Sequence, residues 1–210
     1  MTRRTRQLLG WVGLWLLGVA SAAQAQVPAA GSAHRLCWQQ GRPLVWSDFR
    51  AKAYPKSGPF TGRQTAAISA VSPLLTPIIV QGVRSYRVDC VFLRDSSWVN
   101  AEAGRTVADR DGILAHEQVH FDIAELTTRK LRCRIADGLL AGQELYGPQV
   151  SQDITRLCAE GDSLDEQFDQ EVQHSGGRGT EAPVTKRWHL RIAQALRALA
   201  AYASTATTCP

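Results

Sequence analysis

The stretch "LAHEQVHFDIAE", residues 114–125, contains two histidines four positions apart, with a glutamate directly after the first. If this stretch is helical, His116 and His120 lie one turn apart and point the same way. Two neutral imidazoles in this arrangement can bind one Zn²⁺, and Glu117 can then take a proton from the zinc-bound water. The alternative is that both histidines are ordinary core residues and that Glu117 pairs with an arginine.

The residues on either side of the motif extend it into a long helix. We expect this helix to have Asp111 as its N-cap, to run to Asp137 and to stop at Gly138. Its apolar face is centred near Glu117, which directs the motif into the protein. Five polar residues are expected to form a solvent-exposed stripe: Gln118, Asp122, Glu125, Arg129 and Arg132. Because a buried carboxylate without a partner is costly, three inward polar groups favour a metal site over an ordinary core.

The rest of the chain predicts an α+β fold. Three segments have the alternating or β-branched pattern that is typical of strands: 65–72, 77–83 and 85–93. Two further helices are expected, one over 149–173 with Gly161 as a potential break and one over 183–203. Strands first and helices afterwards indicate one α+β domain, which we place at residues 35–205.

Residues 1–25 have the pattern of an export signal. A basic start precedes an apolar run over residues 8–20 and the small-residue site Ala23-Gln24-Ala25. The apolar run is shorter than the roughly 20 residues that a membrane span needs. We therefore expect cleavage after Ala25, a linker at 26–34, no membrane anchor in the mature protein, and a location in the periplasm or outside the cell.

The net charge gives little support to nucleic-acid binding. The chain carries +5 from 24 basic and 19 acidic residues, but three of its arginines lie in the leader, so the mature chain carries only +2. It also lacks a run of lysines and arginines with interleaved aromatic residues, which is typical of nucleic-acid surfaces. We expect no nucleic-acid partner, and the sequence predicts no particular oligomeric state.

All five cysteines lie in the mature part of the chain. Exported proteins usually pair their cysteines in disulfides, and an odd number leaves one thiol over. The expected pairs are Cys37–Cys90 and Cys133–Cys158, with Cys209 left unpaired.

Four segments resemble, in their order along the chain, a bacterial family of exported proteins described as predicted zinc-dependent peptidases. They are "WSDFRAK" (46–52), "SSWV" (96–99), "LAHEQVHFDIAE" (114–125) and "FDQEVQH" (168–174). The chain differs from the family pattern at Val119, Phe168 and Ser175. The resemblance implies a zincin-like fold, with an antiparallel sheet packed beside the motif helix, and a peptide or protein substrate.

The motif supplies two metal ligands, whereas a catalytic zinc ion usually has three protein ligands and a water. The extended metzincin motif would place a histidine at position 126, which is Leu126. Four residues of the expected second helix are candidates for the third ligand: His174, Asp169, Asp165 and Glu166. The family pattern implies His174, which as a residue near a helix C-terminus can also interact with the last carbonyls. The helical pattern instead places Asp165 on the inward face and Asp169 at its edge.

These observations predict an exported zinc-dependent metallohydrolase of the peptidase type, with His116, His120 and His174 as zinc ligands and Glu117 as the base. The competing hypothesis is a non-catalytic periplasmic or envelope binding protein that holds a structural metal or none. A site closed by four protein ligands would favour the second hypothesis, because water would then have no open position on the metal.

Overall fold

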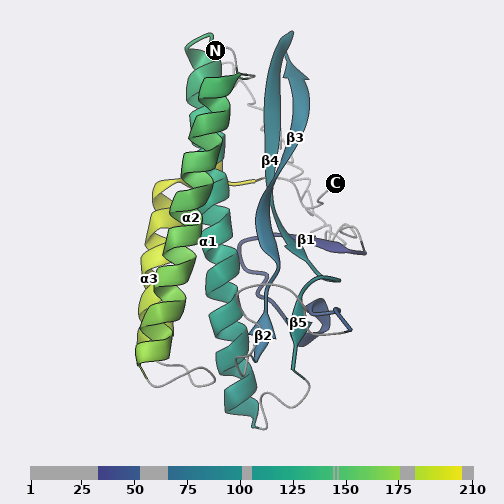
Figure 1. Ribbon diagram of the computed structural model, residues 1–210, viewed down its shortest axis with the longest axis vertical. Coiled ribbons are helices and arrows are strands. Elements are labelled where there is room, and N and C mark those ends of the chain that lie inside the picture. The colour runs from purple at the N-terminus through teal and green to yellow at the C-terminus, as the bar shows by residue number, and fades with distance from the viewer. Residues whose placement is uncertain are drawn as a thin grey trace, which may run out of the picture.

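The computed structural model describes residues 33–52, 66–100, 106–143, 145, 147–175 and 183–204. Two antiparallel sheets and three long helices make up this part of the chain, as shown in Figure 1. The larger sheet has the order β1 (Arg35–Cys37), β4 (Val83–Leu93), β3 (Val71–Val80), and the smaller pairs β2 (Ala67–Ile68) with β5 (Trp98–Val99). The helices are α1 (Val107–Leu140), α2 (Pro148–His174) and α3 (Pro183–Ala198), with short 3₁₀ turns η1 (Trp46–Asp48) and η2 (Ala200–Tyr202). The predicted α+β class, with an antiparallel sheet and three helices, is confirmed.

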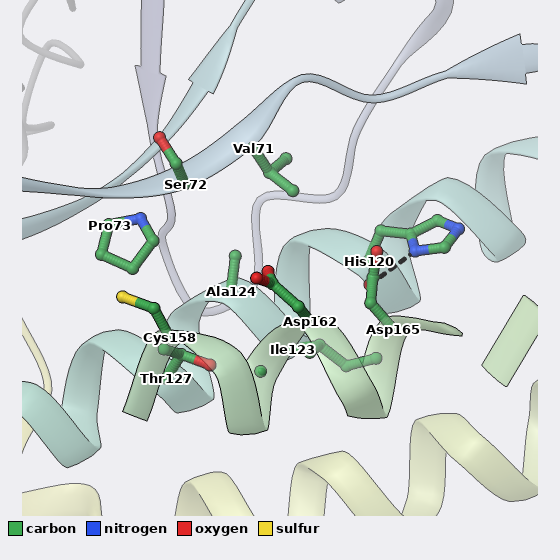
Figure 2. Close-up of a pocket in the computed structure, with 11 residues that line it drawn as sticks. Val71, Ser72, Pro73, His120, Ile123, Ala124, Thr127, Cys158, Asp162 and Asp165 are labelled. Atoms are coloured by element: carbon green, nitrogen blue, oxygen red, sulfur yellow. Dashed lines mark hydrogen bonds and ion pairs between the residues drawn. The ribbon is translucent and has the colours of Figure 1, made fainter. Parts of the chain in front are cut away.

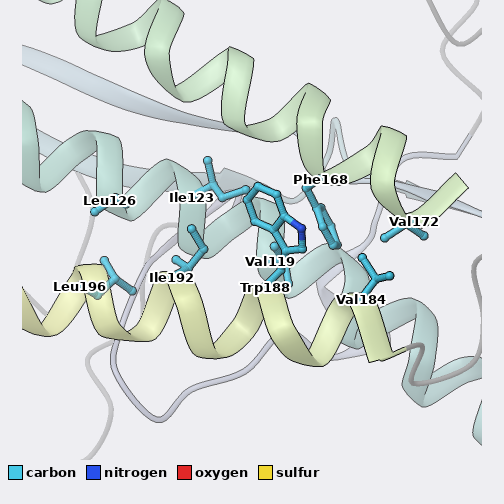
Figure 3. Packing of buried hydrophobic residues seen from close by; sticks show 9 residues of the cluster. All are labelled: Val119, Ile123, Leu126, Phe168, Val172, Val184, Trp188, Ile192 and Leu196. Atoms are coloured by element: carbon cyan, nitrogen blue, oxygen red, sulfur yellow. The ribbon is translucent and has the colours of Figure 1, made fainter. Parts of the chain in front are cut away.

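Helix α1 occupies the centre of the structure. The β-strands lie along one side of it, and α2 and α3 lie along the other (Figure 1). Helix α1 therefore carries a core on each side, one shared with β4 around Phe92 and Phe121 and one shared with the other two helices. Figure 3 shows the second core, in which Trp188 of α3 and Phe168 of α2 pack against Val119 of α1. These two cores fix the rotation of α1 about its axis.

The ends of α1 differ from the sequence prediction. The Thr106 hydroxyl accepts a hydrogen bond from the Asp109 backbone N–H at 3.1 Å, and the Asp109 carboxylate accepts one from the Thr106 N–H at 3.2 Å. This capping box starts the helix at Val107, so the expected start at Asp111 is wrong. Gly138 does not stop the helix, which continues to Leu140. The missing side chain of Gly138 instead makes room for Leu145, since an added Cβ would lie 2.6 Å from the Leu145 Cδ2 atom.

The expected strands are also divided differently. The segment over 65–72 is interrupted at Ser69 and Ala70, where β2 ends before β3 begins. The segment over 77–83 spans a turn, since Gln81 and Gly82 have φ angles of 49° and 82°. Positive φ at both central residues is what a type I′ hairpin turn requires, and this turn joins β3 to β4 directly.

The prediction of a solvent-exposed stripe on α1 is wrong. Glu125 is 1% exposed and Arg129 is 4% exposed. The Glu125 carboxylate accepts hydrogen bonds from Arg129 at 2.8 Å and from Arg132 at 3.2 Å, and the Arg129 guanidinium lies over the Trp38 ring. The charged residues are paired inside the protein because α3, the turn after it and the segment around Trp38 cover this part of α1. A helical pattern alone does not reveal this cover.

The two predicted disulfides are wrong, because Cys90, Cys133 and Cys158 are free thiols. Cys37 lies opposite Val91 in the β1–β4 register and packs with it. Successive side chains of a strand point to opposite faces, so Cys90 points away from Cys37. The other expected pair fails because Cys133 lies beside Asp137 of its own helix, whereas the Cys158 side chain points toward β3.

The expected leader, most of the expected linker and Cys209 lie outside the described residues. Within the described ranges, no helix combines the length and the apolar character needed to cross a membrane.

Helices α1 and α2 approach each other closely at Gly161, through which α2 runs unbroken. A Cβ at this position would lie 2.3 Å from Thr127 Oγ1 and 3.3 Å from Thr127 Cβ. Only glycine therefore fits this contact without a shift of Thr127 or of one helix relative to the other.

We expect Gly161→Ala to lower the free energy of unfolding by about 1–3 kcal/mol, the usual cost of overpacking, despite alanine's higher helix propensity. Urea unfolding of wild type and variant measures this loss. The double variant Thr127→Ala/Gly161→Ala is the matched control, since removal of the threonine side chain relieves the clash. If Gly161→Ala costs as much in the Thr127→Ala background as in the wild type, this explanation is contradicted.

Candidate metal centre

Three side chains from α1 and α2 meet in one cluster, comprising His116, His120 and Asp169. His116 Nε2 lies 3.0 Å from His120 Nε2 and 3.2 Å from Asp169 Oδ1, and His120 Nε2 lies 3.5 Å from the same oxygen. Ligand atoms placed about 2.1 Å from a tetrahedral zinc ion would lie ~3.4 Å apart. The three measured separations are close to this value, so the cluster fits a metal ion.

The phase of α2 brings Asp169 to the histidines. Gly161, Asp165 and Asp169 are spaced at four-residue intervals, so they lie along one face of the helix. Because Gly161 contacts α1 directly, the two aspartates one and two turns further on also face α1. Asp169 is the less exposed of these two aspartates, with 26% of its side chain accessible, compared with 40% for Asp165.

Asp165 orients His120 without joining the cluster. The Nδ1–H of His120 donates a hydrogen bond to Asp165 Oδ1 at 2.7 Å. In neutral His120, a proton on Nδ1 leaves the lone pair of Nε2 directed toward His116 and Asp169. Metal-binding histidines usually have a carboxylate or carbonyl in this role, which fixes the tautomer and makes the imidazole more basic.

His116 is held by packing. Its ring lies 4.7 Å from the Phe168 ring, and the residue is 2% exposed. Its Nδ1 atom has no hydrogen-bond partner among the described residues. The ring is therefore positioned by Phe168 on one side and by the cluster on the other.

The three groups of the cluster have shifted pKa values. Burial lowers the pKa of His116 more than the hydrogen bond to Asp169 raises it. Burial would also lower the pKa of His120, but the hydrogen bond and charge of Asp165, together with Asp169, raise it well above its usual value. Burial would raise the pKa of Asp169, yet the hydrogen bonds from both histidines hold it well below its usual range.

These shifts have a consequence for metal binding. The shifts favour the neutral form of His116 and the cationic form of His120, which has a proton on Nε2 as well as on Nδ1. A metal ion must displace this proton to bind the imidazole, so the affinity for metal falls as the pH is lowered.

Glu117 lies next to the cluster and points toward the β-strands. It is 3% exposed, and its Oε2 atom accepts a hydrogen bond from the Ser69 hydroxyl at 2.6 Å. Ser69 lies in the short segment between β2 and β3, so the interruption of the predicted strand supplies the partner of this carboxylate. The buried Glu117 pairs with a hydroxyl rather than with the arginine that the ordinary-core interpretation requires.

A polar network on another face of α1 attaches neighbouring elements beside the motif. Asp122 accepts hydrogen bonds from Trp38 Nε1 at 2.7 Å and from Gln118 Nε2 at 2.8 Å. His189 of α3 donates from Nε2 to the Ala115 carbonyl at 2.9 Å. These contacts hold α3 and the segment after β1 against the turn of α1 that bears the histidines.

The structure does not place His174 or Glu166 in the cluster. His174 is exposed at the end of α2, and its Nδ1–H donates to the Gln170 carbonyl of the same helix at 2.6 Å. Glu166 is exposed as well and accepts a hydrogen bond from the Gln170 side chain at 3.1 Å. Of the four candidates from the sequence, Asp169 completes the triad and Asp165 orients a member of it.

No protein-family model, curated protein or solved structure matches the chain. The site therefore has to be classified from its own geometry. It consists of two imidazoles from one helix, one carboxylate from the next, and a buried glutamate beside them, which together form a possible metal-binding site.

The third ligand can be identified by measuring metal content. We expect Asp169→Ala to lose the metal on dialysis, because two imidazoles alone hold it weakly, and His174→Ala to keep it. Elemental analysis of both purified variants after loading with zinc gives the stoichiometry. The opposite result, with metal lost from His174→Ala and kept by Asp169→Ala, would show that His174 and not Asp169 is the third ligand.

Loss of the orienting carboxylate should weaken binding without removing a ligand. We expect Asp165→Asn to lower the affinity for zinc by about 10–100-fold, the usual effect of losing such a partner. Competition with a chromogenic chelator measures the dissociation constant. Glu166→Gln, a similar change at the adjacent exposed residue, is the control and should bind zinc as the wild type does. Equal affinities in Asp165→Asn and Glu166→Gln would argue against the orienting role.

Proposed function

We propose that the protein is an exported zinc-dependent hydrolase of the peptidase type, with His116, His120 and Asp169 as its metal ligands. The observation that supports this most is the number of protein ligands in the cluster. Three protein ligands leave one position of a tetrahedral ion open. A structural zinc site is normally closed by four protein ligands. The part of the chain that the structure describes offers no fourth ligand at this cluster.

The choice of zinc rests on the ligands and on Glu117. Two histidines and one carboxylate bind zinc in hydrolases, but the same set can bind Fe²⁺ in oxygenases. A hydrolase needs a base beside the metal, and Glu117 is next to His116 in the chain. The buried, hydrogen-bonded carboxylate therefore favours zinc and hydrolysis.

Each residue of the site then has a defined role. A zinc ion held by the three ligands would make a water acidic and polarise a substrate carbonyl. Glu117 accepts the proton of the attacking water and delivers it to the leaving nitrogen as the C–N bond breaks. The Ser69 hydroxyl holds one oxygen of this carboxylate, and Phe168 keeps bulk water from one face of both histidines.

Three further parts of the proposal rest on the sequence. The zincin-like arrangement and the peptide or protein substrate are supported by the resemblance of the segments around residues 46–52 and 114–125. The position outside the cytoplasm is supported by the pattern of residues 1–25.

Replacement of the proposed base tests the function. We expect Glu117→Gln to retain zinc and to lower the rate of peptide hydrolysis by at least about 100-fold, because a general base contributes on the order of 10²–10⁴ to the rate. Zinc content and cleavage of a defined peptide mixture, read by mass spectrometry, are measured on the same preparations. If zinc-loaded wild type cleaves no peptide, or if the variant cleaves as fast as wild type, the proposed function is wrong.

A further inference from the structure

A cavity of about 240 Å³ lies beside His120, between β3 and α2 (Figure 2). Its floor is formed by α1 through His120, Ile123 and Ala124, and one wall is formed by the start of β3 through Val71 and Pro73. We call this cavity the His120 groove. Of the three cluster residues only His120 lines the groove, and its imidazole points away from the other lining residues (Figure 2). An occupant would therefore lie behind a proposed metal ligand, near the proposed site of reaction but not in it.

The opposite wall of the groove comes from α2 and is acidic. Cys158, Asp162 and Asp165 are spaced at i, i+4 and i+7, so they share the face of α2 that lines the groove. Asp165 is engaged with His120 through the hydrogen bond at 2.7 Å. The groove thus combines apolar residues on its floor and on the β3 wall with two carboxylates on the α2 wall.

Asp162 is the carboxylate left for a ligand. It has no hydrogen bond or ion pair within the described residues, and its side chain points from α2 across the groove toward Val71 (Figure 2). The pKa of the Cys158 thiol, which lies in the same wall, is raised by burial and by the negative charge of Asp162. Asp162 is also exposed, so the groove has an unpaired negative charge at its solvent-accessible edge.

We propose that the His120 groove binds a lysine or arginine side chain of the substrate, with the cationic group at Asp162. The inference rests on the proposed function in assuming a peptide substrate. Lysine and arginine have long aliphatic stems that pack on apolar surface while the charged end remains paired or hydrated. The stem matches Val71, Ile123 and Ala124, and the cation matches Asp162. An acidic side chain would be repelled by Asp162.

The position of the basic residue follows from the geometry of α2. Asp162 and Asp169 are seven residues apart, which corresponds to ~10.5 Å along a helix. An extended peptide advances roughly 3.3–3.6 Å per residue, so about three residues span this distance. The preferred lysine or arginine should therefore lie within about three residues of the cleaved bond.

Alkylation of Cys158 tests occupancy of the groove without metal or catalysis. The metal-free full chain is treated with iodoacetamide in the presence of end-blocked alanine peptides that carry one lysine, norleucine or glutamate, and each modified thiol is quantified by mass spectrometry. Cys133 does not line the groove and serves as the internal control.

The lysyl peptide should slow alkylation of Cys158 at concentrations about fivefold lower than the norleucyl peptide, the difference expected from one partly exposed ion pair. Asp162→Asn should abolish that difference, and Cys133 should react at the same rate throughout. Equal protection by lysyl and norleucyl peptides, stronger protection by the glutamyl peptide, or no protection by any of them would overturn the inference.

A cleavage assay separates this inference from the proposed function. If zinc-loaded protein cleaves peptides with no preference for lysine or arginine near the bond, the proposed specificity for basic residues is wrong and the proposed hydrolase function stands. If the lysyl peptide protects Cys158 but no peptide is cleaved, the binding of a basic side chain in the His120 groove stands and the proposed hydrolase function is wrong.

Discussion

The contact between Gly161 of α2 and Thr127 of α1 determines the distance between the two helices that build the site. With the helices this close, the two following turns of α2 bring Asp165 to His120 Nδ1 and Asp169 to the Nε2 atoms of both histidines. The metal cluster, its orienting carboxylate and one wall of the His120 groove all depend on this approach. A glycine in the middle of a helix normally weakens it, and here that weakness is offset by the packing that it permits.

Helix α1 meets a second constraint, because it is covered by the strands on one side and by two helices on the other. Enclosure keeps the imidazoles and Glu117 away from bulk water, and charges interact more strongly in such an environment than in water. It also encloses the salt bridges of Glu125, which would be solvated on an ordinary surface helix. The buried polar side chains of α1 are thus of two kinds. The negative charge of Glu125 is paired with two arginines. His116 and His120 instead converge on the Asp169 carboxylate at separations that suit a metal ion.

The sequence predicts the parts of this arrangement that depend on local periodicity. A period of 3.6 residues is sufficient to place His116, Glu117 and His120 together on an inward face, and all three are buried. The third cluster residue is harder to predict, because the phase of α2 relative to α1 is set by the contact at Gly161. The family pattern favours His174, while the helical pattern already contains Asp165 and Asp169. The predictions for the charged residues of α1 and for the disulfide pairs are wrong for a related reason, since both depend on which elements cover a residue and on strand register.

The central claim is that His116, His120 and Asp169 bind one metal ion with a position left open. Anomalous diffraction at the zinc edge, from crystals of the protein grown with zinc, tests it most directly. We expect one strong peak about 2.0–2.2 Å from His116 Nε2, His120 Nε2 and an Asp169 oxygen, with solvent at the fourth position. A zinc ion bound elsewhere, or a fourth protein ligand that closes the site, would contradict the claim.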